Sequence, residues 1–300
     1  NFGGIIPLST VDWPGKAAMV VFLRGCPLRC PHCHNSSLQS GQCLMSYHDI
    51  ASRIVSEIKG FRISARAKAG SKAPKTSDAT GPNPPKSCSG RTARLSSTQQ
   101  TDLEEASERA SIKPFVDALV ISGGEPTLQP EACTRIFRLA KSLHLATGLE
   151  TSGCNPDFLE TMLEKGMVDR VFLDIKAAFD ESKYETATGR KNVSSLVNRS
   201  LIACLKSGVP IEVRCTVFPE MPTTADLENI ARTLSSSKKE YPSSRLESMT
   251  LQQGHPCDRG AAFEPVSSEA LQKMAEACRN ACKGELKVLV HAASRIIWKS

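Results

Sequence analysis

The sequence has no long hydrophobic run and no recognisable signal peptide. Its longest wholly apolar stretch near the start is Ala17–Leu23, far short of the roughly 20 residues that a membrane-spanning helix needs. The opening residues, NFGGIIPLST, have neither a basic start followed by an apolar stretch nor a small-residue cleavage site. We therefore expect no membrane span, and we expect a cytoplasmic protein.

The sequence also has little excess charge outside one stretch. Residues 62–94 contain eight Lys or Arg and one Asp, which accounts for the whole net charge of +7. This stretch is rich in Ser, Pro, Gly, Lys and Ala, so it cannot bury enough apolar surface to offset the entropy lost on ordering. We predict a disordered insertion at residues 62–111 within a single domain of residues 1–300. A solvated linker explains the basic charge, and we expect no nucleic-acid partner.

Short apolar runs alternate with amphipathic helical patterns elsewhere, and no repeat of fixed period is evident. The expected strands are Ala17–Leu23, Ala118–Ile121, Leu145–Glu150, Val168–Ile175, Ile211–Val217, Glu247–Gln252 and Leu286–His291. The expected helices are Ser46–Lys59, Pro130–Leu143, Pro156–Lys165, Val193–Ser207, Thr224–Leu234 and Ser267–Cys282. This alternation is typical of a parallel sheet with helical crossovers.

Unusual residues occur repeatedly where these strands end. A cysteine-rich segment follows the first strand, SGGEP follows the second, TSG follows the third and DIK ends the fourth. The carboxyl ends of the strands converge on one face of an α/β barrel, which is where such folds place their active sites. We therefore predict an α/β fold, a partial (β/α)6-type barrel with about six core strands that is incompletely closed.

The cysteine-rich segment, RGCPLRCPHCHN, places Cys26, Cys30 and Cys33 within eight residues and contains no fourth cysteine. One interpretation is a zinc site completed by His32 or His34, although side chains adjacent to Cys33 are poorly placed to complete a tetrahedron with it. A redox pair in CPHC is another interpretation, and it leaves the third cysteine unexplained. A [4Fe-4S] cluster held by three thiolates is the third, and it leaves one iron open to a ligand.

The second motif, SGGEP, spans Ser122–Pro126 and follows an expected strand. Gly123 and Gly124 let a backbone approach a ligand closely, and the Glu125 carboxylate can accept a hydrogen bond from an ammonium group. Standing alone, the motif could be a turn with no function. Its position after a strand, together with the cysteine segment, favours a ligand site.

With both motifs present, the sequence resembles the radical SAM superfamily, whose C-x3-C-x2-C signature is matched by Cys26, Cys30 and Cys33. The resemblance implies that these three residues are catalytic and bind a [4Fe-4S] cluster whose open iron binds S-adenosylmethionine. Reductive cleavage of that cofactor gives a 5′-deoxyadenosyl radical, which abstracts hydrogen from a substrate. Placement of the cofactors and exclusion of water and oxygen are then the tasks of the protein.

The run TVDWPG before the first strand and CHN after it resemble the glycyl-radical-enzyme activating proteins. LVISGGEPTLQP, VFLDIKAAF and LQQGHP resemble the activators of anaerobic ribonucleoside-triphosphate reductase, and pyruvate formate-lyase activase is a close relative. The resemblance covers nearly the whole chain except residues 62–111. It implies hydrogen abstraction from a glycine of a partner glycyl radical enzyme, with a flavodoxin or ferredoxin-type electron donor.

The resemblance also implies, position by position, which residues bind S-adenosylmethionine. They are Gly123, Gly124, Glu125, Thr151, Ser152, Asp174, Lys176, Arg214 and His255. Glu125 would lie near the methionine amino group, and Arg214 and His255 near the carboxylate end of the cofactor. Asp174 and Lys176 match a D-x-K motif, for which a salt bridge at the barrel rim is the alternative.

Two residues depart from the family pattern. His32 stands before the third cysteine, where an aromatic residue is common, and Glu150 stands where the family has Asp. The resemblance also implies a monovalent cation near Glu150, Thr151 and Asp174, and Glu150 adds a methylene group to that site.

Nine further cysteines are scattered along the chain. Cys257, Cys278 and Cys282 could hold a second cluster, or they could be buried helix cysteines. For Cys133 and Cys204 we expect burial as small hydrophobic side chains.

Two other functions stay open at this point. One is a radical SAM enzyme that modifies RNA or a small molecule, with the basic insertion binding phosphates; the other is a non-catalytic, zinc-stabilised interaction module.

Overall fold

The computed structural model describes residues 1–68, 114–256 and 262–292. One eight-stranded sheet runs through them in the order β1-β2-β3-β4-β5-β6-β7-β8. The pair β1–β2 is antiparallel, and every later pair is parallel. The strands are β1 Phe2–Ser9, β2 Ala18–Leu23, β3 Ala118–Gly123, β4 Ala146–Thr151, β5 Arg170–Asp174, β6 Ile211–Val217, β7 Leu246–Gln253 and β8 Val288–His291.

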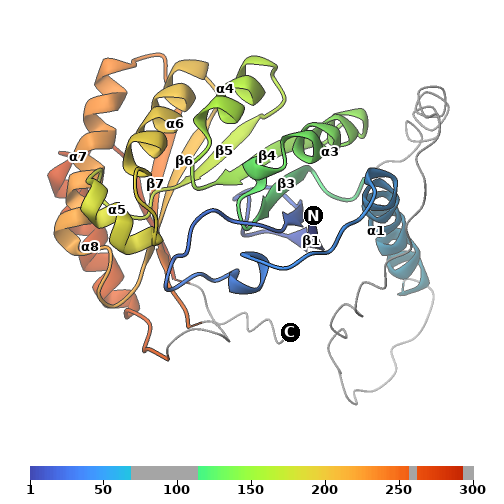
Figure 1. Cartoon of the computed structure of the whole chain (residues 1–300), viewed down its shortest axis with the longest axis horizontal. Coiled ribbons are helices and arrows are strands. Elements are labelled where there is room, and N and C mark those ends of the chain that lie inside the picture. Colours follow the sequence, from blue (N-terminus) through green and yellow to red (C-terminus); the bar gives the residue numbers. More distant parts are fainter. Residues whose placement is uncertain (69–113, 257–261, 293–300) are drawn as a thin grey trace.

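Helices cover the outer face of this sheet. They are α1 Tyr47–Lys68, α3 Pro130–Ser142, α4 Pro156–Glu164, α5 Glu181–Thr188, α6 Ser194–Ser207, α7 Thr224–Glu240 and α8 Ser268–Ala281. Figure 1 shows α3, α4, α6, α7 and α8 as an arc outside the strands, with α1 beyond α3 near β1. Among the described helices, none combines the length and the apolar character that crossing a membrane requires.

The sheet is an open α/β barrel, because the strand order ends at β1 and β8 without pairing them. This confirms the predicted fold class. The seven expected strands all form among the described residues, and β1 adds an eighth. Helix α5 was not expected, and α1 continues to Lys68, so residues 62–68, which were predicted to begin the insertion, belong to a helix. The rest of the predicted insertion, residues 69–111, lies outside the described residues.

Two groups of buried side chains hold the fold together. The larger one fills the space between the sheet and its helices, and it includes Cys133 and Cys204, as expected. A smaller one lies inside the barrel and contains Trp13, Ala18, Val20, Ala118, Val120 and Phe172. Gly148 on β4 makes room for the indole, since a Cβ there would lie 3.0 Å from Trp13. Trp13 thus fills the barrel beneath the strand ends.

Candidate active site

A cavity of about 300 Å³ opens at the carboxyl ends of the parallel strands, which is the size of many small-molecule sites. Ten of the predicted site residues line it: Cys26, Cys30, Cys33, Gly123, Gly124, Thr151, Ser152, Asp174, Lys176 and Arg214. Glu125 and His255 do not belong to the lining. The strand order therefore brings most of the predicted site into one place, although its residues are spread over nearly 200 positions.

The cysteine segment is fixed to its neighbours by backbone hydrogen bonds. Gly25 N–H donates to the Leu38 carbonyl at 2.8 Å, and Glu125 N–H donates to the Gly25 carbonyl at 2.7 Å. Asn35 donates through Nδ2 to the Gly123 carbonyl at 3.2 Å. Gly124 must be glycine, because a Cβ there would lie 2.3 Å from the Gly25 oxygen. The cysteine segment and the Gly-Gly turn therefore form one packed unit.

The three cysteine side chains are partly buried around the cavity. Burial raises the pKa of the Cys26 thiol to about 11. Burial also raises the pKa of Cys30, and the nearby Lys176 ammonium opposes that rise. Thiols of this kind become thiolates when a metal supplies the compensating positive charge.

No three His, Cys, Asp or Glu side chains among the described residues converge closely enough for one metal ion. A tetrahedral zinc site needs such convergence, so the described part of the chain offers no ligand set for the zinc alternative. A cubane makes a different demand, since each of its cysteines binds a separate iron atom.

Asp174 and Lys176 line the same cavity as the cysteines. Lys176 Nζ donates to Asp174 Oδ2 at 2.7 Å. The other carboxylate oxygen, Oδ1, is buried and has no hydrogen-bond partner among the described residues. Although burial alone would lower the pKa of Lys176, the Asp174 and Cys30 charges raise it overall. The pair forms the salt bridge that the sequence offered as an alternative, and it leaves one buried carboxylate oxygen without a partner among the described residues.

Glu125 lies behind the cavity lining and is bound by the protein itself. Its side chain is fully buried, and both carboxylate oxygens accept hydrogen bonds from the protein. Oε1 accepts from Thr127 N at 3.2 Å, Thr127 Oγ1 at 2.6 Å and Thr151 Oγ1 at 2.8 Å. Oε2 accepts from Ser152 N at 2.9 Å and Ser152 Oγ at 2.6 Å. The carboxylate thus joins the end of β3 to the end of β4.

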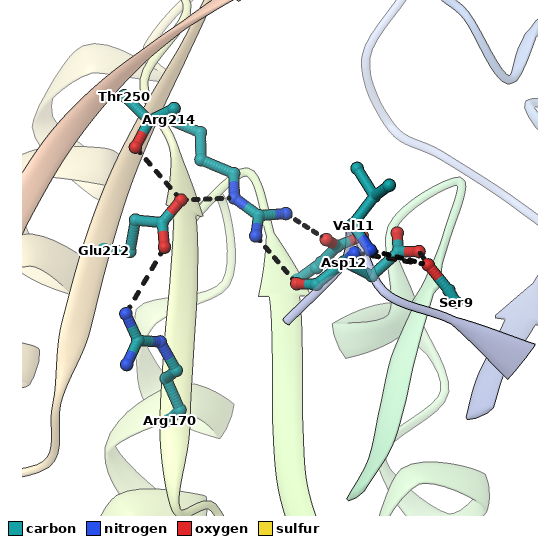
Figure 2. A network of polar contacts seen from close by, with 8 residues as sticks. Ser9, Val11, Asp12, Arg170, Glu212, Arg214 and Thr250 are labelled. Atoms are coloured by element: carbon teal, nitrogen blue, oxygen red, sulfur yellow. Dashed lines mark hydrogen bonds and ion pairs between the residues drawn. The ribbon is translucent and has the colours of Figure 1, made fainter. Parts of the chain in front are cut away.

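Arg214 on β6 lies on the cavity wall within a buried polar network (Figure 2). Its guanidinium is ion-paired with Glu150 and Glu212. Burial raises the pKa of Glu150, and the Arg214 charge acts in the opposite direction. The residues expected around a monovalent cation all line the cavity, but Glu150 already pairs with Arg214, and the Thr151 hydroxyl donates to Glu125.

His255 follows β7 and contacts the cysteine segment rather than the cavity. Its backbone N–H donates to His34 Nε2 at 2.9 Å, while its own Nε2 is buried without a partner among the described residues. His32 lines the cavity, and its ring centroid lies 4.8 Å from that of Phe218. His32 therefore places a flat ring next to the cavity, at the position where the family commonly has an aromatic residue.

Several residues that shape the cavity were assigned no binding or catalytic role from the sequence. They are Val11, Leu28, Gln39, Ala187, Thr216, Phe218, Met221, Pro222 and Gln252. Thr216 and Gln252 lie at the ends of β6 and β7, so the rule that sites form at strand ends could have found them.

Of the three cysteines that could hold a second cluster, Cys278 and Cys282 are buried in the large core. Cys257 lies outside the described residues.

Comparison with known proteins shows the family to which the chain belongs. The model of the Radical SAM superfamily matches residues 20–234, well over half of the chain. This range runs from β2 into α7 and includes both the cysteine segment and the Gly-Gly turn. The superfamily implies a [4Fe-4S] cluster and S-adenosylmethionine, and the donor set fits them. Three thiols line one cavity together with Asp174, whose Oδ1 has no hydrogen-bond partner among the described residues.

Curated relatives resemble the chain over most of its length. A protein of Methanocaldococcus jannaschii, provisionally named a glycyl-radical enzyme activating enzyme, is 29% identical over 77% of this chain and 74% of its own. The isethionate sulfite-lyase activating enzyme of Oleidesulfovibrio alaskensis is 28% identical, covering 78% and 79%. The pyruvate formate-lyase-activating enzyme of Clostridium pasteurianum is 24% identical, covering 75% and 71%.

Solved structures resemble the chain in fold. A structure of TYW1 with a lysine-pyruvate adduct bound is 14% identical, has a TM-score of 0.52, and covers 88% of this chain and 73% of its own. Streptococcus suis SuiB bound to the precursor peptide SuiA is 10% identical, has a TM-score of 0.53, and covers 92% and 48%. By the family match and the cysteine spacing, the chain belongs to the radical SAM superfamily of enzymes.

Proposed function

We propose that this enzyme is an activase that creates a radical on a backbone glycine of a partner enzyme, and that the partner is an anaerobic ribonucleoside-triphosphate reductase. One observation carries the proposal. The three thiols, the Gly-Gly turn and the loop from TVDWPG all border a single cavity. The curated relatives support the activase class through their names, while LVISGGEPTLQP and LQQGHP point to the reductase.

Each part of the cavity has a task in this function. Cys26, Cys30 and Cys33 would hold the cluster, and Asp174 and Lys176 would bind the charged methionine end of S-adenosylmethionine. When both cofactors are bound, the chemistry they supply is one-electron cleavage to methionine and a 5′-deoxyadenosyl radical. The Gly-Gly turn packs directly against the cysteine segment, and this packing would limit the access of water to the reacting atoms.

Glycine suits this cavity as the site of hydrogen abstraction. It has no side chain to block close approach, and its Cα radical is stabilised by the flanking amide and carbonyl groups. We further propose that residues 1–300 act as one domain and that a flavodoxin or ferredoxin-type protein donates the electron.

The test is anaerobic reconstitution of the full chain with iron, sulfide, S-adenosylmethionine and the reductase, under a strong reductant. We expect a stable doublet in the electron paramagnetic resonance spectrum that belongs to the partner protein. Cys30→Ala should abolish the doublet. Cys282→Ala is the matched control, because that thiol is buried in the large core away from the cavity. An intact cluster that yields no doublet with the reductase would remove this partner from the proposal.

A further inference from the structure

Arg214 has every guanidinium nitrogen engaged by the protein. Nε donates to Glu212 Oε1 at 3.0 Å, and Nη1 donates to Glu150. Nη2 donates to the backbone carbonyl of Asp12 at 2.7 Å. The residue is only 7% exposed, so these bonds form where water competes little for the donors. Figure 2 shows the guanidinium between Glu212 and Asp12.

The network behind Arg214 keeps its side chain in one place. Glu212 also accepts a hydrogen bond from Thr250 Oγ1 at 3.1 Å and from Arg170 Nη2 at 3.3 Å. Arg170 in turn pairs with Glu247. Because the charged groups alternate in sign and are mostly buried, Arg214 cannot turn away from its partners without separating Glu150 from its buried ion-pair partner.

Asp12 belongs to a loop that forms one wall of the cavity. This wall loop, residues 10–15, follows β1 and carries Val11 and Asp12, both of which line the cavity. Ser9 Oγ donates to the Asp12 carboxylate and accepts from the backbone N–H groups of Val11 and Asp12. Val11 is 41% exposed and lines the cavity, so it is available to contact a molecule that binds there.

Trp13 connects the wall loop to the same arginine from below. Its ring meets Phe172 edge-on, with centroids 5.7 Å apart. The Arg214 guanidinium lies over the Phe172 ring at 4.1 Å. Arg214 therefore touches the wall loop directly through Asp12, and it contacts the ring on which the loop's tryptophan packs.

We propose that Arg214 is a positioning residue for hydrogen transfer to the protein substrate. It fixes the wall loop, and thereby the surface against which the substrate glycine segment is held beside the cofactors. This role rests on the proposed activase function. It differs from the cofactor-binding role that the sequence resemblance gives Arg214, in which the guanidinium would contact the carboxylate of S-adenosylmethionine.

The first test measures the wall loop without any reaction. Replacing Trp298 with Phe leaves Trp13 as the single tryptophan, since the chain has two. In that background, Arg214→Met and Ser9→Ala should both shift the Trp13 emission to longer wavelength and increase acrylamide quenching. Arg199→Met is the matched control, because Arg199 pairs with Asp157 and Glu160 on the surface. It should leave the emission unchanged.

The second test separates cofactor binding from transfer to the partner. In Ser9→Ala we expect S-adenosylmethionine affinity, and methionine formation without the partner, to change by less than about 3-fold, while the glycyl radical yield falls. In Arg214→Met the glycyl radical yield should fall at least about 10-fold. Ser9 has no contact with the guanidinium, so it tests the loop even if Arg214→Met does not fold.

Two results would overturn the proposal. The first is a large loss of S-adenosylmethionine affinity in Arg214→Met with wild-type behaviour of Ser9→Ala, because Arg214 would then be a cofactor ligand. The second is unchanged Trp13 fluorescence in both variants. If the wild-type chain cleaves S-adenosylmethionine yet activates no partner, the activase function fails, and the fluorescence and affinity measurements still decide whether Arg214 fixes the wall loop.

Discussion

Glu125→Gln is the substitution whose outcome the structure defines most closely. The buried carboxylate accepts five hydrogen bonds from Thr127, Thr151 and Ser152. Glutamine has the same shape, and its amide oxygen can replace one carboxylate oxygen. In one orientation of the amide, its NH2 group faces the Ser152 backbone N–H, which is also a donor. In the other orientation the NH2 group faces the Thr127 backbone N–H. One buried backbone N–H group therefore loses its partner in either orientation.

The expected cost follows from that lost partner. An unsatisfied buried donor costs about 1–3 kcal/mol, and the remaining bonds weaken when the acceptor is no longer charged. Removing the charge also relieves its burial, which offsets part of the loss. We expect a net destabilisation of about 2–3 kcal/mol, and at about 2–4 °C per kcal/mol for a domain of this size the melting temperature should fall by roughly 5–10 °C.

The assay is thermal unfolding of the full chain by circular dichroism, without oxygen, beside Glu164→Gln. Glu164 is exposed at the end of α4, so its replacement should change the melting temperature little. If the two variants melt at the same temperature, the bonds assigned to Glu125 contribute nothing measurable, and the reasoning is refuted.

Ligand binding distinguishes between two roles of Glu125: holding Thr151 and Ser152 in place by hydrogen bonds, and contacting the methionine amino group directly. If Glu125 only holds Thr151 and Ser152 in place, Glu125→Gln should weaken binding of S-adenosylmethionine and of a deaminated analogue by the same factor. A loss confined to S-adenosylmethionine would mean that the carboxylate binds the ammonium group directly.

Three more predictions concern packing, pH and the basic stretch. Gly124→Ala should reduce bound iron per chain by more than half, measured after reconstitution, because its Cβ would collide with Gly25 O at 2.3 Å; full iron loading would contradict this. Burial raises the pKa of Asp226, but bonds from Lys183 and Thr223 hold it below its usual value. Its stabilising effect is therefore present above the unfolded pKa and is lost as pH falls through the lower folded pKa. Asp226→Asn should lower the free energy of unfolding by about 1 kcal/mol at pH 7. In urea titrations this difference between the wild type and the variant should disappear under acid conditions, and a difference that does not depend on pH would refute the prediction. Deleting residues 69–94 should leave activation of the partner unchanged, whereas lost activity would favour a nucleic-acid substrate.

The sequence predicted the sheet well because buried parallel strands are short, continuous apolar runs. It missed β1, since Gly3, Gly4 and Pro7 all weaken a strand prediction, and the antiparallel edge tolerates them. It also missed α5, whose eight residues have little amphipathic pattern and are fixed by an Asp180 cap.

The cysteines and the Gly-Gly turn could be found from the sequence because their residue types and spacing carry the chemistry. The task of Glu125 could not, since the motif does not show that Thr151 and Ser152 lie within hydrogen-bond distance of it. The same holds for Arg214, whose partner Asp12 is 202 residues away. Contacts of this range depend on how the strands are ordered in the sheet.

The central claim is that three thiolates leave one iron of a cluster open to S-adenosylmethionine. The most direct measurement is the electron paramagnetic resonance spectrum of the reduced, reconstituted chain, with and without S-adenosylmethionine labelled with ¹⁵N at its amino group. The account predicts one cubane cluster whose spectrum changes on binding and gains coupling to the labelled nitrogen. A cluster spectrum that is identical with and without the labelled cofactor would contradict it.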